Sequence, residues 1–201
     1  MIKNIIFDLG NVLFKFQPSE FLLRFTNDAE YIKKFIAKIF RSSVWVELDR
    51  GTISLENAEK TFISKYPVEE AFLRLFFGHW MEMLTPIEEN IKIVKELRDL
   101  GFNIFILSNF IKETYVYIEK KYDIFHLFHG QIISGFEKAI KPEKKIYLIL
   151  LNRYQLIPEE SLFIDDVLFY LKPAKKLGMK TIWNKPETNL REELKKSGIS
   201  V

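Results

Sequence analysis

Four apolar runs in this chain lead into polar residues whose side chains could take part in chemistry. In chain order these residues are Asp8, Ser108 with Asn109, Lys141, and Asp165 with Asp166. Together they offer a carboxylate nucleophile, hydrogen-bond donors, a point positive charge and oxygen ligands for a hard cation such as Mg²⁺. The chain has no cysteine, which excludes a thiol nucleophile and a thiolate metal site. One carboxylate after an apolar run is a weak signal, whereas the four groups in this order form a strong one.

The first of these residues ends a short apolar segment. Ile5-Ile6-Phe7 stops abruptly at Asp8, and Gly10 follows two residues later. Such a segment is typical of a buried parallel strand, and open α/β sheets bind their ligands at the carboxyl ends of such strands. We therefore expect Asp8 to lie at the mouth of such a sheet.

Five apolar runs of strand length predict the sheet itself. They are Asn4–Phe7, Asn103–Leu107, Gln131–Ser134, Ser161–Ile164 and Lys180–Trp183. Amphipathic segments between them predict helices at Thr85–Leu100, Glu143–Arg153 and Val167–Leu177. Strands that alternate with helices indicate the α/β class, here a Rossmann-like parallel sheet of about five strands flanked by helices.

The ends of two predicted helices carry local signals. Thr85 and Glu88 form a capping box, with Pro86 at the first helical position. Gly101 and Gly178 follow the last residues of two helices, where a glycine commonly ends the helix.

The stretch from Pro18 to Leu84 contains no predicted strand. Its pattern favours several helices, at about Ser19–Asn27, Asp28–Phe40, Ser54–Tyr66 and Val68–Met83. A crossover between two parallel strands does not need so long a segment. We therefore predict a small all-helical cap domain at residues 17–84, inserted after the first strand into a core domain of residues 1–16 and 85–201.

The order of the motifs resembles the haloacid dehalogenase (HAD)-like hydrolase superfamily over nearly the whole chain. The four matching segments are Phe7–Leu13, Leu107–Asn109, Lys141-Pro142 and Phe163–Asp166. A helical insert after the first motif is similar to the superfamily's type 1 cap. Asp8–Val12, taken with Gly51–Ser54, most resembles the branch that includes sugar-phosphate phosphatases such as α-glucose-1-phosphate phosphatase.

The resemblance implies a Mg²⁺-dependent phosphatase that acts on a small phosphorylated metabolite, with sugar phosphates among the candidates. It implies that Asp8 attacks phosphorus to form an aspartyl-phosphate and that Lys141 is the second catalytic residue. The implied substrate-binding residues are Ser108, Asn109 and Lys141. The implied metal ligands are Asp8, the carbonyl of Gly10, Asp165 and Asp166. Electrostatics supports these roles, because a hard cation and a lysine relieve the repulsion between an attacking carboxylate and a phosphate.

Two residues depart from the superfamily's usual motifs. Gly10 stands where phosphatases usually carry a second aspartate, which protonates the leaving group and later activates water. General acid–base catalysis contributes about 10²–10⁴ in rate, so three explanations stay open: an easy leaving group, an acid from the cap, or poor turnover. Tyr170 stands where the fourth motif usually has Asn or Asp, and its hydroxyl is expected to replace that group in part.

Two other functions are compatible with these motifs. A 2-haloacid dehalogenase also lacks the second aspartate, because halide leaves unprotonated; there Asp8 would attack carbon without a metal. A HAD-fold binding or regulatory protein with weakened catalysis is the other alternative, and Gly10 and Tyr170 are its support. Metal dependence separates the phosphatase from the dehalogenase.

Composition limits the partners and the location. The 201 residues carry a net charge of +3, and the lysines are spread without a dense basic run, so we expect no nucleic-acid partner. No apolar segment reaches about 18 residues, and the N-terminus lacks a signal-type pattern, so we expect no membrane partner and a cytoplasmic location. The sequence leaves the oligomeric state open.

Overall fold

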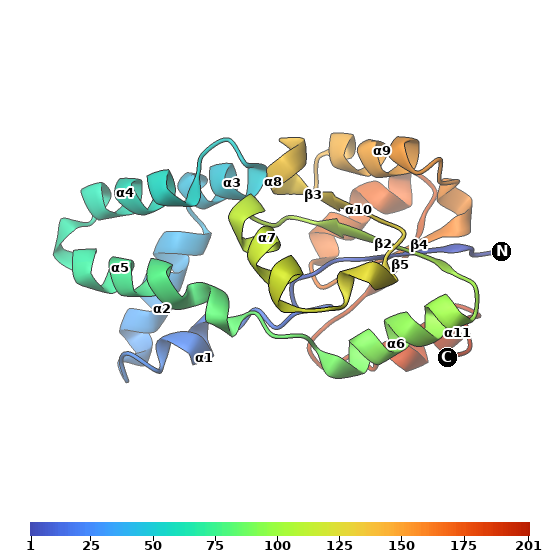
Figure 1. Cartoon of the computed structure of the whole chain (residues 1–201), viewed down its shortest axis with the longest axis horizontal. Coiled ribbons are helices and arrows are strands. Elements are labelled where there is room, and N and C mark those ends of the chain that lie inside the picture. The colour runs from blue at the N-terminus through green and yellow to red at the C-terminus, as the bar shows by residue number, and fades with distance from the viewer.

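The computed structural model describes all 201 residues and contains one five-stranded parallel sheet (Figure 1). Its strands are β1 (Asn4–Phe7), β2 (Asn103–Ser108), β3 (Gly130–Ile133), β4 (Ser161–Asp165) and β5 (Lys180–Trp183). They lie in the order β3-β2-β1-β4-β5, so β1 is the central strand. The predicted α/β class and all five strands are confirmed, and no strand end differs from its prediction by more than one residue.

Strand register brings the polar ends of three strands together. All four residues of β1 are buried, as the apolar run predicts for a central parallel strand. Phe7 lies opposite Ile106 of β2 and Ile164 of β4. One step further along, Asp8 therefore lies between Leu107 and Asp165 at the carboxyl edge of the sheet.

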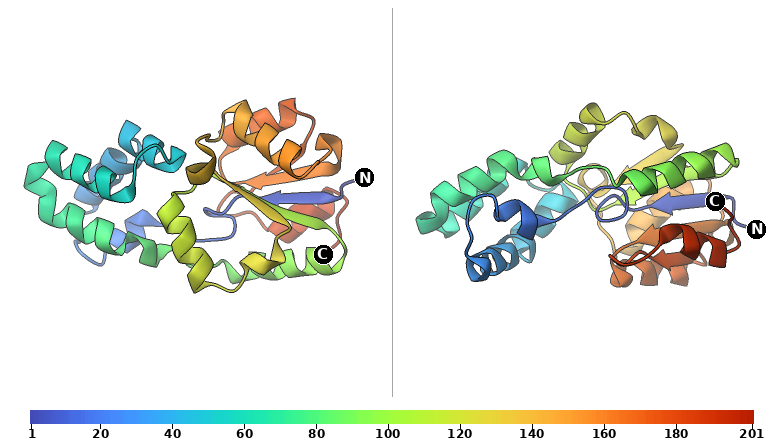
Figure 2. Two further views of the ribbon diagram at one scale, coloured as in Figure 1. Left: turned by 45° about the horizontal axis from the view of Figure 1, so that its top comes forward. Right: turned by 90° about the horizontal axis from the view of Figure 1, so that it is seen from below.

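Helices cover both faces of this sheet (Figure 2). One face carries Ile5 and Phe7 and packs against α6 (Glu88–Asp99), α7 (Lys112–Lys121) and α11 (Leu190–Lys196). The opposite face carries Ile6 and packs against α9 (Lys144–Arg153) and α10 (Leu168–Lys176). Neighbouring residues of β1 thus contribute to two separate apolar cores, because side chains alternate across a strand.

The segment between β1 and β2 is helical, and Figure 1 shows it as a lobe beside the carboxyl edge of the sheet. Its helices are α1 (Pro18–Leu22), α2 (Ala29–Phe40), α3 (Ser43–Arg50), α4 (Leu55–Lys65) and α5 (Glu70–His79), with 3₁₀ turns η1 (Pro67–Glu69) and η2 (Trp80–Met83). Aromatic side chains such as Phe35 and Phe76 fill its centre. We call residues 17–84 the helical insert; its boundaries as a separate domain stay a prediction.

The remaining elements are short. They are α8 (Ser134–Glu137) and the 3₁₀ turns η3 (Phe125–Leu127) and η4 (Pro158–Glu160). The sequence patterns missed α3, α7, α8 and α11, and Val68–Met83 is divided among η1, α5 and η2 instead of forming one helix. No helix combines the length and the apolar character needed to cross a membrane.

The predicted capping box at Thr85 is wrong. The Thr85 carbonyl oxygen accepts a hydrogen bond from the N–H of Lys15, and the N–H of Ile87 donates to the carbonyl oxygen of Leu13, both at 2.8 Å. These residues pair with the loop after β1, and α6 begins only at Glu88. Long-range backbone pairing thus overrides the local capping signal. Gly101 and Gly178 do end their helices, with φ of 87° and 100°.

Candidate active site

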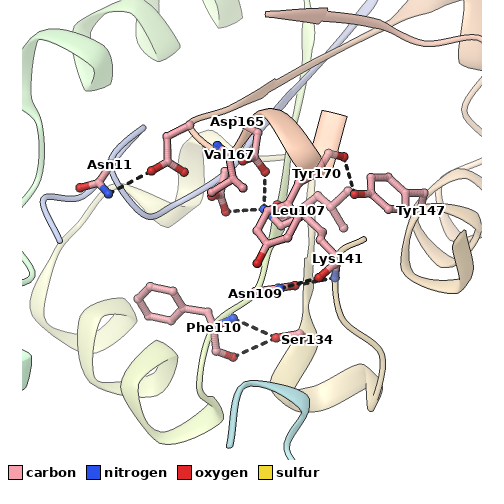
Figure 3. Close-up of polar contacts among 12 residues, drawn as sticks. Asn11, Leu107, Asn109, Phe110, Ser134, Lys141, Tyr147, Asp165, Val167 and Tyr170 are labelled. Atoms are coloured by element: carbon pink, nitrogen blue, oxygen red, sulfur yellow. Dashed lines mark hydrogen bonds and ion pairs between the residues drawn. The ribbon is translucent and has the colours of Figure 1, made fainter. Parts of the chain in front are cut away.

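The side chain of Lys141 lies buried at the carboxyl edge of the sheet, between two carboxylates. Its Nζ donates to Asp165 Oδ2 at 2.6 Å and lies 2.9 Å from Asp8 Oδ1. It also donates to the carbonyl oxygen of Leu107 at 3.2 Å (Figure 3). Burial by itself would lower the pKa of Lys141, but Asp165 and Asp8 outweigh that effect and hold the pKa above its usual range. Lys141 therefore stays charged, and it brings two sequence-predicted carboxylates together.

Aromatic rings complete the surroundings of this ammonium group. The ring centroids of Phe163 and Tyr170 lie 5.4 and 5.2 Å from Lys141 Nζ, within cation–π range. The hydroxyl of Tyr170, expected to replace a polar motif residue, makes no hydrogen bond within the protein; its ring face contacts the lysine instead. The Tyr170 carbonyl accepts a hydrogen bond from the Tyr147 hydroxyl at 2.6 Å.

The two aspartates after β4 are held by different partners. Asp165 Oδ1 accepts from the N–H of Val167 at 2.7 Å, and Asp166 Oδ2 accepts from Asn11 Nδ2 at 3.0 Å. Carboxylate oxygens of Asp8, Asp165 and Asp166 lie within 4.8 Å of one another. Burial raises the pKa of Asp165 to about 7 against the opposing charge of Lys141. Burial, reinforced by the charge of Asp8, raises the pKa of Asp166 to about 6. The cluster thus gathers more negative charge than Lys141 alone neutralises.

These residues fit a hard divalent cation. Three carboxylates without histidine or cysteine form the oxygen-only set that suits Mg²⁺. Asp8 Oδ1 is buried and lacks a hydrogen bond, because its contact with Lys141 Nζ is close but not aligned for one. A cation beside Asp8 would give this oxygen a second charged partner in addition to Lys141. Gly10 lines the same cavity as Asp8, and the role of its carbonyl stays a prediction.

Several hydrogen-bond donors near Asp8 have no acceptor in the protein. Ser108 is buried, and its Oγ has no partner. The backbone N–H groups of Leu9, Gly10 and Asn109 donate to no backbone oxygen. The Asn109 side chain pairs with the backbone of Lys141 through bonds of 2.7 and 3.0 Å, so it positions the lysine segment. Unpaired donors beside a cationic lysine are suited to bind an anion.

A cavity of about 150 Å³ opens beside Asp8, between the core and the helical insert. Its apolar walls are Phe16, Trp45, Trp80, Leu84, Phe110 and Ile111. A single water needs about 10–15 Å³ by this measure, so the cavity has room for a phosphate and a small organic group.

Two residues of this region were not predicted from the sequence. Asp49 of α3 lines the cavity together with Asp8. Asn11, with φ of 51°, adopts a left-handed conformation that asparagine tolerates and so reaches Asp166. The position of Asn11 within the first motif was an available signal. Nothing in the sequence marked which carboxylate of the helical insert would reach the cavity.

A profile of the haloacid dehalogenase-like hydrolases matches residues 2–178. The chain belongs to that family. This HAD-like hydrolase is 24% identical over 177 residues to a sesquiterpene phosphatase of Aspergillus oryzae. The aligned region covers 88% of this chain and 87% of the relative. It is 23% identical over 215 residues to D-ribitol-5-phosphate phosphatase of Bacteroides thetaiotaomicron, covering 96% and 97% of the two chains.

Solved structures share the fold. A HAD family enzyme from Bacteroides thetaiotaomicron, in complex with magnesium and inorganic phosphate, superposes with a TM-score of 0.75 at 21% identity, over 96% of this chain and 99% of that one. L-2-haloacid dehalogenase from Xanthobacter autotrophicus, with chloropropionic acid covalently bound, gives 0.69 at 19% identity, over 100% and 85%. At these identities the likeness concerns the fold alone, so function must be argued from the site.

Proposed function

We propose that this HAD-like hydrolase is a Mg²⁺-dependent phosphatase of small phosphate monoesters that acts through an aspartyl-phosphate on Asp8. The observation that carries the proposal is the cluster of Asp8, Asp165 and Asp166, whose oxygens lie within 4.8 Å of one another. The buried Lys141 pairs with two of them, Asp8 and Asp165. Unpaired donors beside it suit phosphoryl oxygens, and the three carboxylates suit a divalent metal, which a haloacid dehalogenase does not need. The sequence likeness to two phosphatases adds support.

In this mechanism one oxygen of Asp8 attacks phosphorus opposite the leaving oxygen. Lys141, the Ser108 hydroxyl and the free N–H groups of Leu9, Gly10 and Asn109 bind the phosphoryl oxygens and stabilise the charge that develops on them. Bound Mg²⁺, held by Asp8, Asp165 and Asp166 with the Gly10 carbonyl, would neutralise phosphate charge. Water then hydrolyses the aspartyl-phosphate and releases Asp8.

The walls of the cavity bear on the substrate. Six apolar side chains, three of them on the helical insert, surround the space next to Asp8. A sugar phosphate, which the resemblance suggested, would leave many hydroxyls unpaired against such walls. We therefore propose an ester whose organic group has a large apolar face, such as an aryl or prenyl group. The named activity of the Aspergillus relative agrees with this choice, and that of the Bacteroides relative favours a polyol phosphate.

One assay set tests the function and its rivals. Aryl, prenyl and sugar phosphates are incubated with the protein, with and without Mg²⁺, and phosphate release is measured. In parallel, 2-chloropropionate is incubated in metal-free buffer and chloride release is measured. Phosphate release only with Mg²⁺ supports the proposal; chloride release without metal supports the dehalogenase that Gly10 permits. No turnover of either class would favour a binding protein.

A further inference from the structure

Asp49 is the one carboxylate that the helical insert contributes to the cavity beside Asp8. It is the penultimate residue of α3, and the rest of the insert's cavity wall is apolar. The catalytic motifs, by contrast, carry Gly10 where a proton-donating carboxylate is usual. Apart from the nucleophile Asp8, the core therefore contributes no carboxylate to the cavity, and the insert contributes one.

Three consecutive residues attach this part of the insert to the core. The Ser134 hydroxyl donates to the Asp49 carbonyl oxygen at 2.6 Å. Arg50 forms two hydrogen bonds of 3.0 and 2.7 Å with Glu143. Gly51, with φ of 76°, lies against the backbone of Gly135. Figure 3 shows the blue-green ribbon of the insert next to Ser134, which in turn is bonded to Phe110 of the cavity wall. The backbone of Asp49 is therefore held in place relative to the sheet edge.

The Asp49 side chain itself has no protein partner. Its carboxylate makes no hydrogen bond and no ion pair, although the residue lies in a largely apolar cavity. An unpaired charge in such a place is costly, so the neutral form is favoured. Burial, reinforced by the charge of Asp8 and opposed by Lys141, raises the pKa of Asp49 to about 7. A carboxyl group of this kind carries a proton in a substantial fraction of molecules near neutral pH, as a general acid must.

We propose that Asp49 is the general acid and base of this phosphatase, supplied by the helical insert in place of the missing carboxylate at Gly10. This inference rests on the proposed function.

The two half-reactions balance with Asp49 as the proton carrier. In the first, an Asp8 oxygen forms a bond to phosphorus, the bond from phosphorus to the ester oxygen breaks, and its electron pair takes the proton of Asp49. The alcohol leaves, and Asp49 is a carboxylate. In the second, water attacks phosphorus while Asp49 accepts its proton; the bond from phosphorus to Asp8 breaks, and its electron pair returns to the Asp8 carboxylate. Leaving oxygen and water use the same side of phosphorus, so one group serves both steps.

Two other groups in the cavity carry dissociable protons. Burial raises the pKa of Tyr170 above its usual range, and its ring is packed against Lys141. Thr114 is buried with an unpaired hydroxyl, which is far too weak an acid to compete. Tyr170→Phe is therefore the matched control, since it removes the other acidic hydroxyl that lines the cavity and keeps the ring.

The structure also offers a rescue variant. A Cβ added to Gly10 would meet no atom within 4 Å, and the residue has no positive φ, so an aspartate fits there locally. Gly10→Asp in the Asp49→Asn background would return a carboxylate to the cavity from the core side. A merely structural role of Asp49 could not be replaced from that position.

The experiment measures kcat/KM with Mg²⁺ for alkyl phosphates, p-nitrophenyl phosphate and 2,4-dinitrophenyl phosphate. We expect Asp49→Asn to lose about 10²–10⁴-fold on alkyl phosphates, the usual range for a lost general acid, and far less on the dinitrophenyl ester, which leaves unprotonated. Tyr170→Phe should leave the dependence on leaving-group pKa unchanged, and Gly10→Asp with Asp49→Asn should recover part of the lost rate. The aspartyl-phosphate should also accumulate in Asp49→Asn, detected by chemical quench.

Each contrary result has a distinct meaning. An equal loss by Asp49→Asn on every ester, or no loss on any, overturns the role of Asp49 while leaving the phosphatase intact. A steeper dependence in Tyr170→Phe instead of Asp49→Asn assigns the proton to the tyrosine. A parent protein that hydrolyses none of the esters overturns the proposed function itself, and the acid with it.

Discussion

Gly51 of the helical insert and Gly135 of the core are in backbone contact: a Cβ on Gly51 would lie 2.1 Å from the Gly135 carbonyl oxygen. Gly51 has a positive φ of 76°, as the C-terminal residue after α3. The contact joins the end of α3 to α8 and so places the neighbouring Asp49 beside the cavity. Two glycines thus permit this close approach between the insert and the core.

Gly51→Ala should therefore disturb both stability and catalysis. The added methyl group collides with backbone that cannot move aside, and we expect the free energy of unfolding to fall by about 1–3 kcal/mol beyond the cost of the positive φ. Gly101→Ala is the matched control, because Gly101 has a φ of 87° and no atom within 4 Å of an added Cβ. Chemical denaturation measures both variants, and equal losses would show that the Gly135 contact does not matter.

Asp8→Asn should abolish phosphate release while leaving the fold intact. The amide has nearly the shape of the carboxylate but cannot attack phosphorus, so we expect a loss of at least about 10³-fold in kcat. Circular dichroism and thermal unfolding check the fold. Activity comparable to the parent would show that another group is the nucleophile.

Chelation should remove activity reversibly. Asp8, Asp165 and Asp166 form an oxygen-only cluster, so EDTA is expected to eliminate ester hydrolysis and added Mg²⁺ to restore it. Mg²⁺ should also raise the melting temperature, because it binds the folded cluster and not the unfolded chain. Undiminished phosphate release in metal-free buffer would contradict the metal assignment.

Lys141→Met should destabilise the protein at neutral pH. Removing one member of a buried ion pair typically costs about 3–5 kcal/mol, because the remaining charges lose their partner. Here Asp8 and Asp165 both lose theirs. Mg²⁺ should recover part of the loss by supplying positive charge. Lys144→Met, on the exposed start of α9, is the control and should change stability by less than about 0.5 kcal/mol, measured by denaturant titration.

Asp49→Asn should stabilise the protein in metal-free buffer at higher pH. The pKa of Asp49 is raised from 3.8 in the unfolded chain to about 7 in the folded one. Below pH 3.8 the carboxyl is protonated in both states, and the variant gains nothing from the lost charge. Between these pKa values the unfolded state releases its proton first, so the parent loses stability as pH rises. At about 1.4 kcal/mol per pKa unit, the loss reaches about 4 kcal/mol, and it is smaller where water enters the cavity.

Melting temperatures of the parent and Asp49→Asn between pH 4 and 8 test this expectation. The difference between the two proteins should increase with pH and level off above pH 7. A constant difference would mean that the pKa of Asp49 is not raised in the folded protein, and its proposed role as a general acid would lose support.

Much of the fold follows from local sequence. Each strand of the sheet is a short apolar run, because a parallel strand that is buried on both faces needs apolar side chains on both. Asp8, Ser108 and Asp165 stand at the ends of three such runs, and parallel pairing alone brings those ends to one edge. The family motifs at these positions therefore predicted the gathering of the carboxylates around Lys141.

The rest depends on contacts between distant parts of the chain. Thr85 has the sequence pattern of a helix cap, but Thr85 and Ile87 pair with the loop after β1, and α6 begins only at Glu88. Tyr170 uses its ring instead of its hydroxyl, since only packing decides which part of it meets Lys141. Asp49 carries no local mark of function; the approach of Gly51 to Gly135 is what brings it to the cavity. Periodicity and motifs depend on each residue's own segment of the chain. The position of the helical insert depends instead on contacts between its surface and that of the core, which no local pattern records.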